Sequence, residues 1–192
     1  MSLRRAVLPA AVVGLLPSAA SAHLVQSGLG PFYDGLLHPL ISLEDLLPVL
    51  ALAILAGLRG AAHARWLLLV VPLAWLAGYA AGGVVPAGPS VLLAVGVFSV
   101  LLGMAAAAAV PVPRAVLLAT GTVLGFTHGL VVGPAVGWLA VAGSAITVGA
   151  VIAVVSGEVS ALRAAWTRIA ARVLASWTAA AGMLQLGWML RG

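Results

Sequence analysis

Three ionisable residues lie within eight positions of one another in an apolar part of the chain. His38, Glu44 and Asp45 belong to the run His-Pro-Leu-Ile-Ser-Leu-Glu-Asp-Leu-Leu-Pro at 38–48. Imidazole nitrogens and carboxylate oxygens without thiolates suit Ni(II), Co(II) or Zn(II) better than Cu(I). Ionisable groups inside a membrane are costly and by default mark a functional site. If this run lies in a membrane, it therefore predicts a site for a divalent transition metal ion.

A helical backbone would bring some of these groups together. His38, Ser42 and Asp45 follow i, i+4, i+7 and would share one helix face, whereas Glu44 would point away. Pro48 cannot donate a hydrogen bond to the Glu44 carbonyl, so we expect a kink at Pro48. That kink would turn Glu44 inward and free its carbonyl oxygen. The alternative is that both carboxylates lie in a water-filled outer vestibule without a ligand.

A second polar stretch, at 120–130, carries His128. Glycines recur every fourth residue along this stretch and beyond it, at positions 121, 125, 129, 133 and 137. Such a seam lets another helix approach closely, so His128 should face protein rather than lipid. The alternative is a core histidine that hydrogen-bonds across helices. Both polar stretches share G-x-x-H-x-L, at 35–40 and 125–130, which is a weak sign of an internal repeat.

The composition places these residues in a membrane protein. Of the 192 residues, 64% are apolar and 7% charged, whereas a soluble domain is about 45–50% apolar and about 25% charged. The sequence contains no cysteine, which excludes disulfides, Cys-based zinc sites and thiol catalysis. The arginines are scattered singly, so the pI near 11.5 does not indicate nucleic-acid binding. The predicted fold class is an all-α, polytopic protein of the lipid bilayer.

Short breaks rich in Gly, Pro or Arg divide residues 23–192 into six predicted transmembrane helices. They cover about 36–58, 66–82, 90–109, 115–135, 138–157 and 169–190. Span one runs inward from about residue 37, and span four runs outward to about residue 135. At about 1.5 Å per residue, Glu44, Asp45 and His128 share a depth of roughly 10 Å. We therefore expect one metal site built from His38, Glu44, Asp45 and His128.

Residues 1–22 are predicted to be a cleaved signal peptide. Arg4 and Arg5 precede a short apolar stretch and a small-residue cleavage site; an uncleaved anchor is the alternative. Cleavage after Ala22 makes His23 the first residue, whereas cleavage after Ala20 leaves an amine-x-His terminus that suits square-planar Ni(II) or Cu(II). We therefore expect His23 to be a further metal ligand, unless it is simply a histidine in a loose terminus.

The distribution of arginine predicts the orientation. With the N-terminus outside, the inner side carries six arginines, at 59, 65, 114, 163, 168 and 172, and the outer side carries only Arg191. Cytoplasmic loops are enriched in this way. An even number of spans then places both termini outside the cytoplasm.

The chain resembles the HupE/UreJ family, small bacterial permeases associated with nickel supply to hydrogenase and urease. The resemblance covers the signal peptide ending before a histidine, the six spans, and the H-P-L opening of span one. The family pattern there is H-x5-D-H followed by L-L. His38 matches this pattern, Glu44 keeps the carboxylate, and Asp45 replaces the second histidine.

Span four of the family reads F-H-G-x-A-H-G-x-E. Aligning His128 and Gly129 with the second H-G puts Leu124 at the first histidine and Val131 at the glutamate. Aligning Phe126 and the same pair with the first H-G needs a one-residue insertion and loses the second histidine. Either alignment lacks one histidine and the acid, so the predicted ligand set is more anionic than the family's.

The resemblance implies a secondary importer in the bacterial inner membrane. Nickel or cobalt would be its transported substrate, and no cofactor would be permanently bound. The alternative is a non-transporting accessory that binds metal or a partner during metalloenzyme maturation. A hydrolase based on Ser144 and His128 is the least favoured interpretation, because no specific motif surrounds the serine; we expect no enzyme. The protein could form a homo-oligomer or bind a metalloenzyme-maturation partner, and the sequence does not distinguish these.

Overall fold

The computed structural model describes residues 27–84, 88–132 and 136–191, and the regular elements within these ranges are all helices. The predicted signal peptide and His23 lie outside the described residues. The helices are α2 (Pro31–Ile41), α3 (Leu43–Arg59), α4 (Ala61–Ala64), α5 (Leu67–Gly82), α6 (Pro89–Ala107), α7 (Arg114–Val132), α8 (Trp138–Ala161) and α9 (Ala165–Met189).

The predicted all-α membrane fold is confirmed. Five helical segments among the described residues are long and apolar enough to cross a membrane, namely 61–82 and the helices α6 to α9. The pair α2 and α3 passes the same test together and supplies the sixth crossing if it forms one bent span. Boundary differences of four to five residues lie at the start of the first span, where α2 begins at Pro31 rather than at about 36, and between α8 and α9, where helix extends past 157 and resumes before 169.

The bend in the first span was predicted at the wrong residue. The helix breaks at Ser42, whose backbone is extended (φ −82°, ψ 105°), and the two halves meet at 67°. Pro48 lies inside α3 without breaking it. The carbonyl that the proline ring crowds belongs to Glu44, in the first turn of α3, where the chain has only just become helical. The break lies upstream of Glu44, and α3 continues through Pro48.

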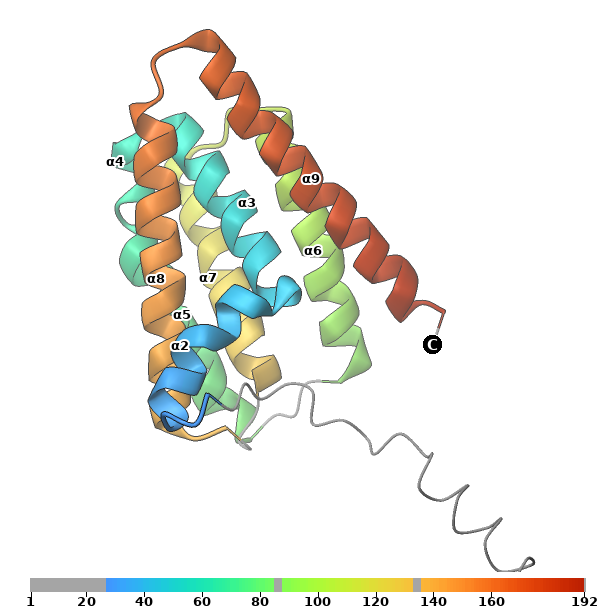
Figure 1. Cartoon of the computed structure of the whole chain (residues 1–192). Helices are drawn as coiled ribbons and strands as arrows, with labels where there is room; N and C mark the ends of the chain where they lie inside the picture. The colour runs from blue at the N-terminus through green and yellow to red at the C-terminus, as the bar shows by residue number, and fades with distance from the viewer. Residues whose placement is uncertain (1–26, 85–87, 133–135, 192) are drawn as a thin grey trace, which may run out of the picture.

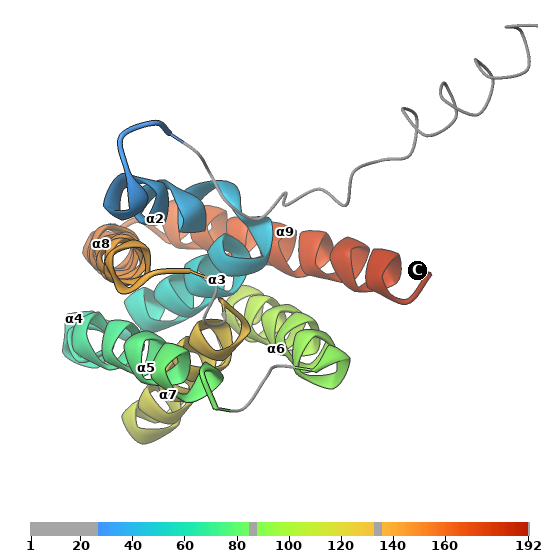
Figure 2. The same ribbon diagram turned by 90° about the horizontal axis from the view of Figure 1, so that it is seen from below.

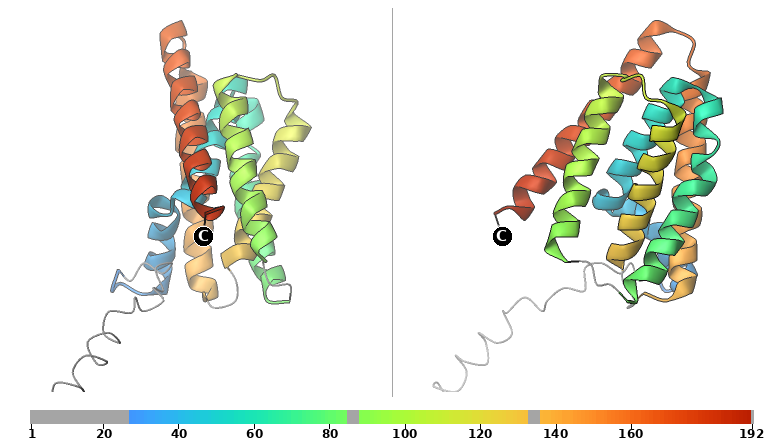
Figure 3. Two further views of the ribbon diagram at one scale, coloured as in Figure 1. Left: turned by 90° about the vertical axis from the view of Figure 1, so that its right-hand side faces the viewer. Right: turned by 180° about the vertical axis from the view of Figure 1, so that it is seen from behind.

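The helices associate in pairs around α3 (Figures 1 and 2). α5 packs against α7, α6 against α9, and α2 against α8, while α3 contacts α6, α8 and α9. The pair formed by α6 and α9 slants away from the other helices toward the end where α2 lies (Figure 3). The connections α3–α4, α6–α7 and α8–α9 all lie at the opposite end of the bundle (Figure 1), and we call this the arginine-rich end. Arg59, Arg65, Arg114 and Arg163 lie in or beside these connections.

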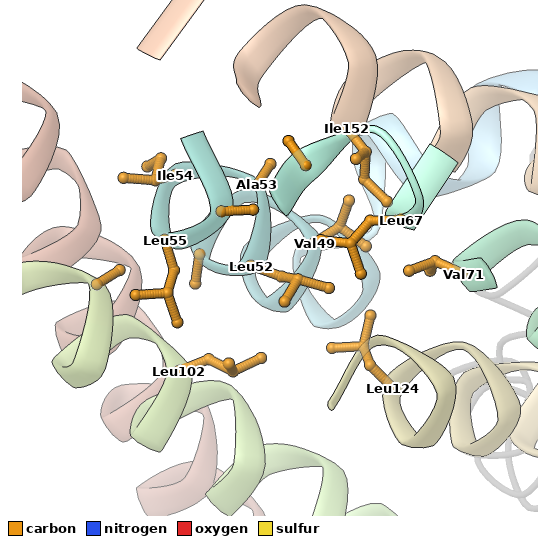
Figure 4. Close-up of a cluster of buried hydrophobic side chains, with 14 of the residues drawn as sticks. Val49, Leu52, Ala53, Ile54, Leu55, Leu67, Val71, Leu102, Leu124 and Ile152 are labelled. Carbon is orange, nitrogen blue, oxygen red and sulfur yellow. The ribbon is translucent and has the colours of Figure 1, made fainter. Parts of the chain in front are cut away.

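The core is centred on α3 (Figure 4). Leu52 is fully buried and lies among Leu67 of α5, Leu124 of α7 and Ile152 of α8. Lipid tails are as apolar as leucine, so close packing, rather than transfer out of water, stabilises such a core within a bilayer. In the first turn of this central helix, Asp45 is buried among the neighbouring helices.

The predicted glycine seam on α7 is confirmed for the described glycines 121, 125 and 129. A Cβ on Gly125 would lie 2.4 Å from the Val71 carbonyl oxygen, and one on Gly129 would lie 2.0 Å from the Trp75 carbonyl oxygen. α5 also contributes a glycine to this contact, since a Cβ on Gly78 would lie 2.0 Å from a carbonyl oxygen of α7. Only residues without a side chain allow this approach. The seam ends before Gly137, where a Cβ would meet nothing within 4 Å.

Candidate metal centre

Asp45 lies between two histidines from different helices. Its Oδ2 is 3.2 Å from His38 Nε2, and its Oδ1 is 3.9 Å from His128 Nε2. Asp45 and His128 are buried, with 6% and 3% of their surfaces exposed, and 21% of the His38 side chain is exposed. α2, α3 and α7 thus each supply one ionisable side chain to a cluster at the break of the first span.

The break at Ser42 does not separate His38 from Asp45. The Ser42 amide donates to the His38 carbonyl and closes α2, while the Ser42 carbonyl accepts the amides of Asp45 and Leu46 and opens α3. The sequence spacing had placed His38 and Asp45 on one face of an unbroken helix. The two side chains meet instead across the angle between two half-helices.

His128 is hydrogen-bonded at both ring nitrogens. Nδ1 lies 2.9 Å from the Leu124 carbonyl oxygen of its own helix, and Nε2 lies 3.1 Å from the Glu44 carbonyl oxygen of α3. A carbonyl oxygen only accepts, so each ring nitrogen forms its hydrogen bond when it carries a proton. A metal ion bound at Nε2 would have to replace the contact with the Glu44 carbonyl oxygen.

Glu44 reaches the cluster through its backbone. Residue 48 of an α-helix normally donates its N–H to the carbonyl of residue 44, and Pro48 has no N–H. The oxygen that loses this donor is the one that faces His128. The Glu44 side chain is half-buried and follows a different direction from that of Asp45, since successive residues of a helix point about 100° apart.

A second proline frees a second carbonyl, and this one anchors α2. Pro39 leaves the Gly35 carbonyl without its helical donor, and the Ser144 hydroxyl donates to that oxygen at 3.0 Å. Thr147 donates to the neighbouring Leu36 carbonyl at 2.8 Å. Ser144 and Thr147 are thus interhelical hydrogen-bond donors, and this role of Ser144 gives no support to a nucleophile. The half-helix that carries His38 is held by α8.

The α2–α8 contact is also very close. A Cβ on Gly35 would lie 1.8 Å from the Ala140 carbonyl oxygen, and one on Gly143 would lie 2.4 Å from the Phe32 carbonyl oxygen. The shared G-x-x-H-x-L motif therefore has a structural counterpart. In both stretches the glycine packs against a neighbouring helix, and the histidine three residues later faces Asp45.

Trp75 forms a wall of the cluster that the sequence did not reveal. Its side chain is fully buried on α5, and its ring lies 5.4 Å from the His128 ring, tilted by 32°. Within the described ranges its indole Nε1 is buried without a hydrogen-bond partner. The only signal in the sequence is its position in the α5 face that meets the glycine seam. Which histidine it would contact depends on the tertiary packing.

The cluster is tight. Asp45 Oδ2 is buried and lies 3.2 Å from His38 Nε2 without forming a well-directed hydrogen bond. The adjacent gap, between Pro39, Asp45 and Val148, is too narrow to hold a water molecule. No three His, Asp or Glu side chains among the residues described here stand in an arrangement that holds a metal ion. Binding by all the predicted ligands would therefore require side chains to move.

Comparison with known proteins identifies the family. No curated protein and no solved structure matches the chain. The sequence model of the family described as HupE / UreJ protein matches residues 11–188, which covers all the helices of the cluster. The chain therefore belongs to the HupE/UreJ family, which is linked to nickel or cobalt uptake or to accessory roles.

Proposed function

We propose that this protein imports a divalent transition metal ion, nickel or cobalt, across the bacterial inner membrane. The ion is the transported substrate, and its intramembrane ligands are drawn from His38, Glu44, Asp45 and His128. The observation that carries the proposal is the buried Asp45 carboxylate between two imidazoles. Family membership supports the choice of metal.

The chemistry of the cluster suits a cation. A carboxylate in a low-dielectric interior attracts a positive ion more strongly than it does in water. Neutral imidazole nitrogens are good ligands for nickel and cobalt. Discontinuous helices whose freed carbonyl oxygens line the path of an ion are a recurring feature of secondary transporters. The Ser42 break, and the Glu44 carbonyl that faces His128 instead of a helical N–H, give the first span these features.

The helix contacts suggest how the site opens. His38 belongs to α2, which is anchored on α8, while Asp45 belongs to α3 and His128 to α7. A rotation of α2 and α8 about Ser42 would change the distance between His38 and Asp45 without breaking either helix. We propose that the ion enters from the outer side, where His23 collects it, and leaves inward after such a movement. Binding displaces protons from the histidines, and reprotonation favours release.

The alternative function is a non-transporting accessory that binds metal or a partner in metalloenzyme maturation. The finding that favours it is that no three His, Asp or Glu side chains in the described ranges stand in an arrangement that could hold a metal ion. The chain also lacks one histidine and the acid of the span-four pattern. An accessory protein would bind metal or depend on a partner without accumulating the ion in the cell.

Paired binding and uptake measurements separate the two functions. Radiolabelled nickel and cobalt are bound to the purified full chain in lipid nanodiscs, and the same ions are counted in cells that lack their own importers. An importer shows both signals, and His38→Ala and His128→Ala abolish both, whereas the control His63→Ala keeps both. Binding without uptake identifies the accessory role. If the chain neither binds nor takes up either ion, the proposal is overturned.

A further inference from the structure

A small groove opens on the bundle surface at the arginine-rich end, between α4–α5 and α8. Its volume is about 170 Å³, and its lining includes Arg65, Leu68, Ala153, Gly157 and Ser160. It is separate from the His38–Asp45–His128 cluster and shares no residue with it. The groove combines one cationic side chain with apolar walls.

The positive charge around this groove is not neutralised by the protein. The guanidinium groups of Arg65 and Arg114 lie 5.9 and 5.3 Å from the centre of the same Trp66 ring. Neither arginine forms a salt bridge within the described ranges, which contain all four acidic residues of the chain. Glu158 of α8 directly follows Gly157 in the sequence, but it lines a different groove together with residues of α3 and α9. Arg65 and Arg114 contact the same Trp66 ring and have no carboxylate partner, so their charge favours binding of an anion from outside the protein.

The floor of the groove is open. A Cβ on Gly157 would meet nothing within 4 Å, so space lies directly above the α8 backbone. The hydroxyls of Ser156 and Ser160 both donate to carbonyl oxygens of α8. Arg65 is therefore the lining residue that offers charged hydrogen-bond donors to a ligand.

We propose that the groove binds an anionic phospholipid, with its phosphate at Arg65 and an acyl chain along Leu68 and Ala153. Guanidinium groups bind phosphate oxygens in a bidentate manner, and basic pockets between transmembrane helices bind anionic headgroups. A lipid is favoured over free phosphate because the walls below the arginine are apolar. Next to the groove, Trp66 is 43% and Leu69 57% exposed, as expected of side chains at a lipid boundary.

The test is native mass spectrometry of the full chain, purified in a neutral detergent. Phosphatidylglycerol, phosphatidylcholine and inorganic phosphate are added in separate arms. We expect the wild type to retain one phosphatidylglycerol at least roughly five-fold more tightly than phosphatidylcholine. Arg65→Gln should remove this preference, and Gly157→Leu should block retention by filling the groove.

Two matched controls keep the test specific. Arg163→Gln removes an exposed arginine at the same end, and Gly187→Leu fills open space beside a helix elsewhere; both should retain the lipid as wild type does. Equal retention of the two lipids would overturn the proposal, as would equal behaviour of Arg65→Gln and Arg163→Gln. Displacement of the lipid by an equal concentration of phosphate would identify a site for free anions and would also overturn it. Thermal unfolding of each variant verifies that it is folded.

Discussion

His128 Nε2 lies 3.1 Å from the Glu44 carbonyl oxygen, an acceptor that Pro48 leaves without its helical donor. This contact joins α7 to the first turn of α3, next to the residue at which the span breaks. It also sets the direction in which the His128 ring faces Asp45. A proline in one helix thereby orients a histidine in another.

Pro48→Ala tests this relationship. The alanine N–H competes with His128 for the Glu44 carbonyl, so we expect nickel affinity to fall several-fold while the free energy of unfolding stays equal or rises. Equilibrium binding and thermal unfolding of the purified chain measure the two effects. Pro72→Ala, at the proline inside α5, is the control and should leave nickel affinity unchanged. Unchanged affinity in Pro48→Ala would show that the contact does not matter for binding.

Ser144→Ala should destabilise the protein by roughly 1 kcal/mol, because the Gly35 carbonyl loses its donor in a buried contact. Pro39→Ala restores a helical N–H for the same oxygen, so the double variant should recover part of the loss. A double-mutant cycle of unfolding free energies measures this coupling. Strictly additive effects would contradict the assignment of Ser144 as the substitute donor.

Gly129→Ala should cost roughly 1–3 kcal/mol, because its Cβ would lie 2.0 Å from a backbone carbonyl oxygen of α5. The helices can accommodate the methyl group only by separating, which also moves Trp75 away from His128. Unfolding measurements and tryptophan emission report the two consequences. Gly137→Ala, where the Cβ meets nothing within 4 Å, should behave like wild type. Equal stability of the two variants would contradict the tight α5–α7 seam.

Nickel binding should weaken as the pH is lowered from roughly 7 to roughly 5, since protons compete with the ion for imidazole nitrogens. The sign follows because a metal ion binds an imidazole nitrogen only when that nitrogen carries no proton. Binding isotherms at each pH measure the effect. The control His63→Ala should show the same pH dependence of nickel binding as wild type. Affinity that rises on acidification would contradict imidazole ligation.

The helical membrane fold, the glycine seam and the loss of the helical donor to the Glu44 carbonyl could be predicted from the sequence. Each of these follows from a local rule, namely apolar length, residue size, or the missing N–H of proline. The break at Ser42 could not be predicted in this way. The proline rule concerns Pro48 and the Glu44 carbonyl, and Ser42 lies outside that turn. Trp75 and the Ser144–Gly35 hydrogen bond depend on which helices become neighbours. Local patterns in the sequence do not specify that pairing.

The central claim is that Asp45 is a ligand of the transported ion, and the most direct test is nickel accumulation by cells that produce Asp45→Asn. The matched control is Asp34→Asn, which alters a carboxylate at the start of α2 that accepts hydrogen bonds from Ser27. At equal membrane expression, wild type and Asp34→Asn should accumulate radiolabelled nickel, and Asp45→Asn should remain at the empty-vector level. Accumulation by Asp45→Asn at the wild-type rate would contradict the account.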